Sequence, residues 1–346
     1  SHVNLSGVGC PELGTILTMP TSGELSTDYK LYGSEYTGEM AQPGYYALKL
    51  SKYDILAEVA ATMRTSIERY TFRKGKAHII VNLGQGLTNE SGGFIRKISD
   101  TEIEGMRLCG GFCYHSQSVF PQYFVIRVSK KPQVAGFWKK QPNMTAEAEW
   151  DEYAGKYKVY TDYAREMAGD DLGYRFTFAA EDGEQICVQM GVSFVSCENA
   201  RQNLEAEQPA CNFDQVRAEA HRQWEDALER VKVSGGSEEQ KEIFYTALYH
   251  ALLHPNVLND VNGEYPLMQG GQNAAQNEVV KTGIGKVAKG HNRYTVFSLW
   301  DTSRNLHQLL TLVYPEKQID MVRSMVDMYK EWGWMPKWEL YGRETF

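Results

Sequence analysis

The sequence predicts a β + α chain in two unlike parts: an antiparallel β-sandwich up to about residue 200, then helices in series. Up to Ser196, apolar and polar residues alternate with a period of two in many short segments, which is typical of strands with one buried face. No helix-length segment separates them, and parallel strands would need such crossovers. From Asn203 onward, apolar residues recur at intervals of three and four, the period of amphipathic helices.

The strand segments are joined by turns rich in glycine and asparagine, such as residues 89–93. Turns of this kind between short alternating runs favour antiparallel pairing. We therefore expect one apolar face per strand, directed into the core of the sandwich. The residues expected on these faces are Ile55, Ala57, Val59, Ala61 and Met63; Ile79, Val81 and Leu83; Phe124, Ile126 and Val128; Tyr174, Phe176 and Phe178; and Ile186, Val188, Met190, Val192 and Phe194.

Four helices are expected in the second part. The first runs from Phe213 to about Val231 and ends at the Ser-Gly-Gly-Ser segment 234–237. Ser237 followed by two glutamates and a glutamine is typical of a helix start, and His254–Pro255 closes that second helix. Pro315 is expected to end the third. The apolar faces of the third and fourth helices carry Leu306, Leu309, Leu310 and Val313, and Ile319, Val322, Met325, Val326 and Tyr329.

Composition limits the classes of function. At 346 residues and 42% apolar, the chain can bury a large core, and its length suggests two domains. A formal net charge of −8 argues against a nucleic acid or an anionic membrane as partner. No run of about 18 apolar residues occurs, so no membrane span is expected. We expect both ends of the chain to be cut, so the absence of a targeting segment carries no weight.

The six cysteines are too few and too scattered for a disulfide scaffold. Cys109 and Cys113 have metal-like spacing, but no second Cys or His pair completes four ligands. A glycine-rich strand connection with two incidental thiols is the preferred explanation. A disulfide between these two, or between Cys187 and Cys197, stays open in an oxidising compartment.

Residues 294–304 contain the most informative functional pattern. Trp300 can offer a flat apolar face to a sugar ring, and the Asp301 carboxylate can accept hydrogen bonds from neighbouring hydroxyls. Arg304, one helical turn further on, can hold that carboxylate in place. Together these groups predict a carbohydrate site. In a competing interpretation, Asp301 is the N-cap of a helix and Trp300 is part of the core.

Several segments, in consistent order over the whole chain, resemble a known family. They include residues 2–10, 39–46, 57–64, 244–255 and 336–340, and the best match is 294–302 with its Trp-Asp-Thr motif. The family is glycoside hydrolase family 92, calcium-dependent exo-α-mannosidases. Two positions depart from its pattern: Asn4 stands where a histidine is usual, and Ser303 where an aromatic residue is usual. The roles of those two side chains at the sugar can therefore differ here.

The resemblance implies a β-sandwich over residues 1–200, a helical linker over 201–236 and the start of an (α/α)6 barrel over 237–346. It implies hydrolysis of terminal α-mannosidic linkages with inversion and with calcium as cofactor. The substrate would be a mannose-containing glycan, such as an N-glycan or yeast-type mannan. The location would be secreted or, in a bacterium, periplasmic.

In an inverting glycosidase the acid and base carboxylates stand about 6.5–9.5 Å apart to admit a water molecule. The resemblance places these carboxylates and the calcium ligands in a Glu-Gly-Asn segment and an Asn-Asp-Asp segment. Neither segment occurs in this chain. We therefore expect the acid, the base and the metal ligands to lie beyond Phe346.

The residues present would then form the wall of the mannose pocket. By matching the Trp-Asp-Thr motif, Asp301 is expected to bond sugar hydroxyls, with Trp300 and Arg304 shaping the site. His2 would reach into the cleft where the two domains meet, a common place for pockets. The substrate-binding residues implied by the resemblance are Asp301, Trp300, Arg304, His2, Trp338 and Glu339.

Two other function classes stay open. The chain could bind carbohydrate without turning it over, because it lacks the expected acid and base. It could also be another sandwich-plus-(α/α)-barrel enzyme, a phosphorylase or a polysaccharide lyase. A phosphorylase would need a basic phosphate pocket and a lyase residues that neutralise uronates, and neither is evident in this acidic chain. His221 and His307 fall among charged residues on helix faces, and we expect both to be solvated.

Overall fold

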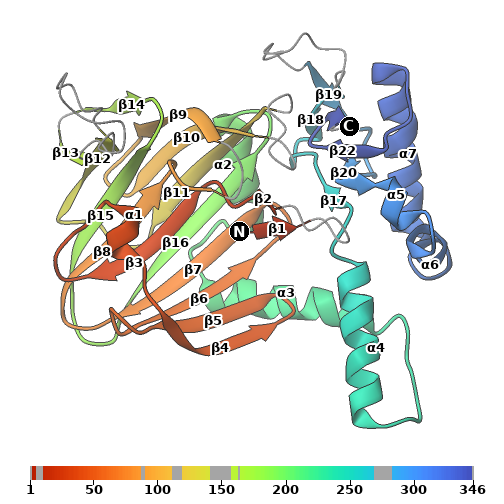
Figure 1. Cartoon of the computed structure of the whole chain (residues 1–346), viewed down its shortest axis with the longest axis horizontal. Helices are drawn as coiled ribbons and strands as arrows, with labels where there is room; N and C mark the ends of the chain where they lie inside the picture. Colours follow the sequence, from red (N-terminus) through yellow and green to blue (C-terminus); the bar gives the residue numbers. More distant parts are fainter. Residues whose placement is uncertain are drawn as a thin grey trace, which may run out of the picture.

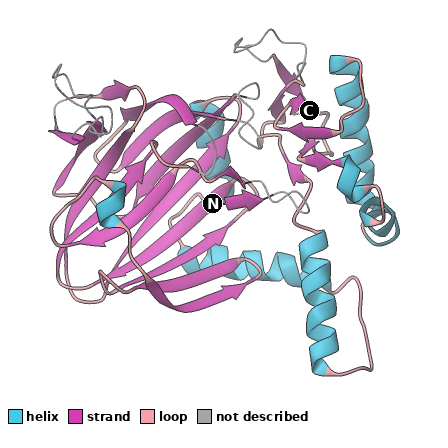
Figure 2. Cartoon of the chain, viewed as in Figure 1, coloured by secondary structure: helices cyan, strands magenta, loops and turns pink. Residues whose placement is uncertain are grey.

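The computed structural model describes residues 2–4, 11–86, 90–110, 119–140, 157–162, 164–268 and 283–344. Figure 1 shows a large β-rich half, coloured red to green, and a smaller half of helices and short strands, coloured cyan to blue. Two consecutive helices, α3 and α4, connect them. Figure 2 shows the same division, with strands filling the first half and most of the helical residues in the second.

One sheet of the first half has nine strands, and every pairing in it is antiparallel. Its strand order brings segments distant in sequence side by side, so that β11 and β7 both flank β16. In spatial order the strands are β14 (Glu166–Ala168), β9 (Glu90–Lys97), β10 (Glu102–Cys109), β11 (Phe120–Val128), β16 (Glu184–Ser193), β7 (Thr65–Phe72), β6 (Ile55–Ala61), β5 (Tyr45–Leu50) and β4 (Tyr36–Gln42).

The second sheet has five strands, also all antiparallel. In spatial order they are β13 (Tyr157–Thr161), β12 (Val134–Lys140), β15 (Leu172–Ala180), β8 (Gly75–Asn82) and β3 (Leu17–Ser22). A short helix, α1 (Tyr29–Tyr32), follows β3, and β1 (His2–Asn4) pairs with β2 (Pro11–Leu13) as a separate hairpin.

The main core lies between the two sheets. Phe124 and Ile126 of β11 and Ile79 and Phe176 of the facing sheet are fully buried in one cluster. Burying a side chain of this size contributes about 1.5–3 kcal/mol. The expected antiparallel sheets with inward apolar faces are thereby confirmed.

Strand β6 departs from the expected alternation. Ala57 and Val59 are only half-buried and Ala61 is exposed, whereas Glu58 and Ala60 are buried. Glu58 faces the outer side of the sheet, where it binds the Arg69 guanidinium with Nε–Oε2 at 2.7 Å. The prediction holds at Ile55, which is fully buried in the main core, and at Ala57, which packs against that core. It fails at Ala61 and Met63, which are exposed, and on the outer face, where a helix covers the strand.

That outer face is covered by two helices. Ala200 and Leu204 of α2 (Cys197–Glu207) pack on Val125, and Phe213 of α3 (Phe213–Leu228) packs on β6 and β7 beside Ile67. Helix α3 is the first helix expected from the sequence. The domain boundary expected at residue 200 falls inside α2, a helix that packs on the sandwich.

The second half contains the remaining helices. At the start of α4 (Glu238–Ala251), Gln240 N–H donates to Ser237 Oγ at 3.2 Å, and Ser237 N–H donates to Gln240 Oε1 at 3.0 Å. This capping box confirms the expected helix start. Helices α5 (Leu299–Thr302), α6 (Leu306–Val313) and α7 (Pro315–Trp332) follow. The short strands are β17 (Asn256–Val257), β18 (Glu264–Pro266), β19 (Ile284–Lys286), β20 (Tyr294–Thr295), β21 (Phe297–Ser298), β22 (Trp338–Leu340) and β23 (Arg343–Glu344).

Helix α7 packs through a face different from the one the sequence pattern favours. Met321 and Met328 are buried at 4% and 0% exposure, whereas Ile319 and Val322 are 50% and 44% exposed. The helix therefore carries apolar residues on two faces, and only one is covered by the described residues. Among those residues, no helix is both long and apolar enough to cross a membrane.

The two halves meet through an apolar contact built on Tyr341. Its ring stacks on Phe194 with centroids 4.6 Å apart and lies 4.8 Å from Phe120. Leu258 and Val296 of the second half complete this cluster. Aromatic pairs of this kind contribute about 0.5–1.5 kcal/mol beyond the area they bury.

Beside it lies a polar contact centred on Asp260, just before β18. Its carboxylate accepts hydrogen bonds from Ser193 Oγ at 2.7 Å, Asn199 Nδ2 at 2.8 Å and Asn203 Nδ2 at 2.6 Å. Burial raises the pKa of Asp260, while these donors oppose that rise. Ser193 belongs to β16 and both asparagines to α2, so this residue joins the second half to the sandwich.

Candidate functional site

The predicted site residues of the second half lie at one corner, where a strand pair leads into α5. Ser298 of β21 is paired with Trp338 of β22, and Leu299 N–H donates to Lys337 O at 2.9 Å. This pairing places residues 298–302 beside 337–339, although nearly forty positions separate them in the sequence. Figure 1 shows β22 and α5 next to each other in the helical half.

Two indole rings mark this corner. Trp300 is 67% exposed, and its ring centroid lies 6.4 Å from that of half-buried Trp338, with the ring planes at 55°. The Lys337 ammonium lies 4.5 Å from the centroid of the Trp338 ring. An exposed tryptophan supported by a second one forms an apolar platform of the kind that can receive the face of a sugar ring. The suggestion that Trp300 belongs to the core is wrong.

Asp301 lies within α5, not at its N-cap, which is Ser298. The Ser298 hydroxyl donates to Asp301 Oδ2, and the side chain is half-buried. The other carboxylate oxygen, Oδ1, has no hydrogen-bond donor among the described residues. The N-cap explanation is therefore wrong, and Asp301 keeps an acceptor atom that can bind a ligand hydroxyl.

Arg304 does not hold this carboxylate. It is exposed and forms no ion pair with the residues that the structure describes. The expected pairing rested on a continuous helix, but α5 ends at Thr302, with Ser303 as its C-cap, so the two residues do not share one helix face. The expectation that Arg304 orients Asp301 is corrected accordingly.

Glu339 is fully buried in β22. Its carboxylate accepts hydrogen bonds from Gly342 N–H at 2.7 Å, Thr295 Oγ1 at 2.9 Å and Val296 N–H at 3.2 Å. Burial raises its pKa to about 7, and these bonds lower it in part. Without solvent access it offers nothing to a sugar, so the structure gives it a supporting place instead of the expected contact.

That support acts on a strained turn. Val296 has φ of 65°, a left-handed conformation that β-branched residues strongly disfavour. Val296 lies directly before β21, which leads into Trp300 and Asp301. By accepting a hydrogen bond from the Val296 N–H, Glu339 stabilises the turn that positions Trp300 and Asp301.

Sequence reasoning missed a polar network behind Asp301. Thr302 Oγ1 donates to Ser298 O at 3.0 Å and lies 3.0 Å from His307 Nε2, and His307 Nδ1 lies 3.1 Å from Gln318 Oε1. His307 is half-buried, so the expectation that it is solvated was wrong, while His221 is exposed as expected. The four-residue spacing of Ser298 and Thr302 was the available signal. The Thr302 hydroxyl thus fixes the backbone at Ser298, and the Ser298 hydroxyl fixes the Asp301 carboxylate.

His2 lies in β1, paired in register with Leu13. Its side chain is outside the described part of the structure, so its approach to the cleft stays a prediction. In the view of Figure 1 the β1 hairpin lies on the side of the sandwich that faces the second half.

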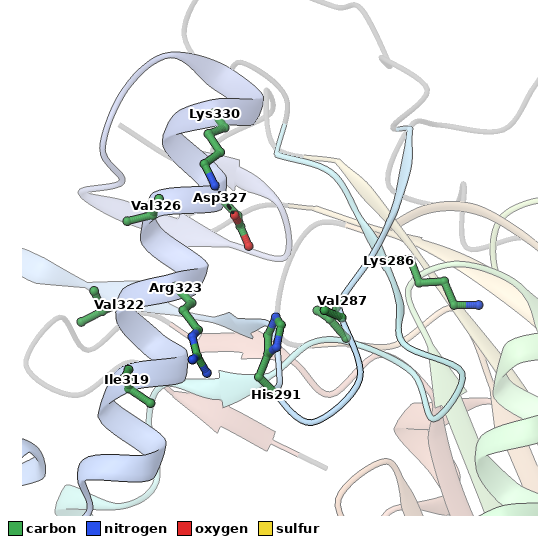
Figure 3. Close-up of a pocket in the computed structure, with 10 residues that line it drawn as sticks. Lys286, Val287, His291, Ile319, Val322, Arg323, Val326, Asp327 and Lys330 are labelled. Atoms are coloured by element: carbon green, nitrogen blue, oxygen red, sulfur yellow. Dashed lines mark hydrogen bonds and ion pairs between the residues drawn. The ribbon is translucent and has the colours of Figure 1, made fainter.

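Two surface cavities flank the 286–292 loop. One, of about 540 Å³, lies at the junction of the two halves and is lined by Arg64, Asn259 and residues 286–292 among others. The other, of about 430 Å³, lies between the same loop and α7. Figure 3 shows the second, with the α7 side chains on one side and His291 and Val287 from the loop on the other. Neither cavity is lined by Trp300 or Asp301.

The described residues contain no cluster of three or more His, Cys, Asp or Glu side chains placed to hold a metal ion. A calcium site needs several oxygen ligands, and we assign none among the described residues. Of the Cys109–Cys113 pair, Cys109 is buried and Cys113 lies outside the described residues, so a disulfide between them stays a prediction. Cys187 and Cys197 are free thiols, so the disulfide left open between those two is absent.

Comparison with known proteins decides the family. The model of the glycosyl hydrolase family 92 N-terminal domain matches residues 1–193, and that of the family 92 catalytic domain matches residues 199–346. The chain belongs to glycosyl hydrolase family 92. Both family domains are therefore represented, and their matched regions adjoin at α2.

Solved family 92 structures have the same fold. An α-mannosidase from Bacteroides thetaiotaomicron is 29% identical, with a TM-score of 0.83 over 99% of this chain, and has also been solved with mannoimidazole. An inverting mannosidase from the same organism is 23% identical, with a TM-score of 0.76 over 94% of this chain. This chain spans 44% and 40% of their respective lengths. An uncharacterized secreted glycosidase from Arthroderma benhamiae is 28% identical over 99 residues, 28% of this chain and 12% of that protein.

Proposed function

We propose that the protein acts in the hydrolysis of terminal α-mannosidic linkages in glycans, with inversion at the anomeric carbon. The observation that carries this proposal is the corner formed by Trp300, Trp338 and Asp301. It lies in the part of the chain that matches the family 92 catalytic domain and combines an exposed apolar platform with a half-buried carboxylate, one oxygen of which accepts no hydrogen bond from the described residues. The family 92 α-mannosidase with mannoimidazole supports a mannose-containing ligand.

In this proposal the terminal mannose lies with its apolar face on Trp300. Asp301 accepts hydrogen bonds from adjacent sugar hydroxyls through Oδ1, while Ser298 holds Oδ2. A charge-assisted hydrogen bond contributes about 1.5–3 kcal/mol. The corner binds and orients the sugar. The proton transfers of hydrolysis require an acid and a base carboxylate in addition to Asp301. We assign no described residue to that pair.

The exposed apolar face of α7 supports an (α/α)6 barrel as the architecture of the catalytic domain. A soluble helix with two apolar faces is stable when both are covered by neighbours. Ile319, Val322 and Val326 are exposed on one side of α7, and Met321 and Met328 are buried on the other. Further helices of the barrel would cover the exposed side.

Calcium dependence and a secreted or periplasmic location follow the same reasoning. The described residues contain no group of three or more His, Cys, Asp or Glu side chains placed to hold a metal ion, so we derive no step through calcium. A chelator that leaves mannose release unchanged would remove it from the proposal. Secretion is supported by the secreted glycosidase similar to this chain and is tested by fractionating cells that express the protein.

The central experiment measures both turnover and binding. Turnover is the release of mannose from 4-nitrophenyl α-mannoside, with the anomer of the product followed by NMR. Binding is calorimetric titration with mannoimidazole. Release of β-mannose supports the proposal. Binding without release supports the alternative of a carbohydrate-binding protein. If the protein shows no binding and no release, both the proposal and the alternative are contradicted.

The corner itself is tested with Asp301→Asn. We expect affinity for mannoimidazole to fall at least about tenfold, because one charge-assisted bond contributes about 1.5–3 kcal/mol. Asp327→Asn on α7 is the matched control, because Asp327 lies on the far side of that helix from the corner's network and bonds only Lys330 among the described residues. Equal affinities for the two variants would remove Asp301 from the site.

A further inference from the structure

A pair of free thiols lies where the α2–α3 connection crosses the outer face of β16. Cys187 and Gln189 are two residues apart on that strand and therefore point to the same face. The Gln189 amide donates to the carbonyls of Gln208 at 3.1 Å and Ala210 at 3.3 Å. These two bonds place residues 208–210 directly over the face that carries Cys187, and Cys211 is the next residue.

The connection is fixed on the other side of Cys211 as well. Phe213, at the start of α3, is buried in a cluster with Ile67 and Val216, and Cys187 packs against that cluster. Cys211 therefore stands between two anchored points, over the face of β16 that carries Cys187, and the interaction between the two thiols shifts the pKa of each. Cys187 itself is held in place, since its N–H donates to Ser129 Oγ at 2.9 Å.

The surroundings lower the pKa of the Cys187 thiol. The hydrogen bond with Cys211 lowers the pKa of Cys187 against the opposing effect of burial, and Arg69, its register partner on β7, lowers it further. The same contact raises the pKa of Cys211. Cys211 is exposed and Cys187 half-buried, so one sulfur is open to reagents and the other is poised as a nucleophile.

We propose that Cys187 and Cys211 form a reversible disulfide that fastens the α2–α3 connection to the outer face of β16. This goes beyond carbohydrate binding and does not depend on it. In an oxidising environment such a bond persists, and in a reducing one it opens.

The reaction balances with a small disulfide as oxidant. The Cys211 thiol gives its proton to water and attacks one sulfur of the reagent, which breaks the reagent S–S bond and releases one thiolate. The Cys187 thiolate then attacks Cys211 Sγ, forms the Sγ–Sγ bond and releases the second thiolate. Both released thiolates take up protons. The two cysteines lose two electrons and the reagent gains them.

The bond would close a loop that runs from β16 through all of α2. Cross-linking of this kind restricts the unfolded chain, so the folded state gains stability. It would also fix the start of α3, the helix through which the sandwich continues into the second half.

The test treats the purified full chain with excess oxidised glutathione and then with reductant. We expect a mass loss of about 2 Da from two departing hydrogens, a peptide pair joined through Cys187 and Cys211, and a melting temperature several degrees higher that reductant reverses. Cys211→Ser removes all three effects, and because this position is exposed, that variant should fold even if one at Cys187 does not.

Cys197→Ser is the matched control. Cys197 is another half-buried thiol, bonded to Gly105 O at 3.2 Å, and its loss should leave the oxidation unchanged. The proposal is overturned if glutathione stays on Cys211 as a mixed disulfide, if Cys187 joins a different cysteine, or if the chain keeps all its thiols.

Discussion

The sandwich and the helical half bury their apolar residues differently. In the sandwich, the inner sheet faces close on each other, and α2 and α3 cover much of the outer face of the larger sheet. In the helical half, α7 buries one face against its neighbours and leaves Ile319, Val322 and Val326 exposed. Leu312 of α6 is 83% exposed and Ile243 of α4 is 63% exposed.

The contrast shows where the described residues form a complete structural unit. A protein interior is stable when its apolar surface is removed from water on all sides, and the sandwich with α2 and α3 meets this condition. The helical half meets it only in part: Met321, Met328 and Tyr314 are buried in a core of its own, whereas the apolar residues named above stay exposed. We therefore expect the first half to set the stability of the whole chain and the second to open first.

The largest expected effect lies in the sandwich core. Phe176→Ala should lower the free energy of unfolding by about 3–5 kcal/mol, because the cavity lies between two fixed sheets. Denaturant unfolding followed by circular dichroism of the strands measures it. Tyr36→Ala, at a position 53% exposed on the edge strand β4, is the control. If Phe176→Ala lowers the free energy of unfolding by less than about 1 kcal/mol, the sandwich core does not set the stability of the chain.

We expect pH to change the free energy of unfolding of the second half by about 3 kcal/mol. The pKa of Glu339 is about 7 in the folded chain and 4.5 in the unfolded chain, at about 1.36 kcal/mol per pH unit. Because the folded state holds the proton more tightly, stability falls as pH rises from 4.5 through 7 and the full penalty is present above that. Glu339→Gln should flatten this slope in denaturant titrations.

The exposed Glu238 provides a control for that pH experiment, since Glu238→Gln should keep the slope of the unmodified chain. An identical slope in Glu339→Gln would show that the buried carboxylate does not control the stability of this half.

A smaller effect is expected at the junction. Tyr341→Leu removes two aromatic contacts, each of about 0.5–1.5 kcal/mol, and should loosen the second half without unfolding the first. Hydrogen exchange separates the two responses: amides of β20 to β23 should exchange faster, and amides of β8 and β15 should not change. Faster exchange in both halves would mean that they unfold together.

The smallest effect is expected on the open face of α7. Val322→Ser should change stability by less than about 0.5 kcal/mol, as surface substitutions do, whereas Met328→Ser on the buried face should cost several times more. Thermal unfolding of the two variants gives the comparison. A large loss for Val322→Ser would show that this face is covered in solution.

Much of the fold could be predicted because the spacing of apolar residues in the sequence indicates which face of a strand or helix is buried. The strands with Phe124, Phe176 and Ile186 and the helix starts at Phe213 and Ser237 followed from spacing alone. The errors at β6 and α7 share a cause. Periodicity does not reveal that a second element covers the outer face of β6, or which of two apolar faces of α7 is packed.

The site could be predicted in part. The Trp-Asp-Thr motif located Trp300 and Asp301, but the relation to Arg304 failed because α5 ends at Thr302, before Arg304. Glu339 was expected at the sugar from the resemblance alone, whereas the structure buries it completely. Its carboxylate is buried against the Thr295 hydroxyl, which lies 44 positions away in the sequence, and a contact between such distant residues is not encoded locally.

Asp260 has a consequence for exchanging domains between relatives. Its carboxylate is shared among Ser193, Asn199 and Asn203, so a transplanted sandwich is compatible with this catalytic segment only if it brings the hydroxyl and both amides with it. A hybrid joined at residue 236 takes all three donors from one parent protein. A hybrid joined inside α2 takes them from two parents and can leave the buried Asp260 carboxylate without one of its hydrogen bonds.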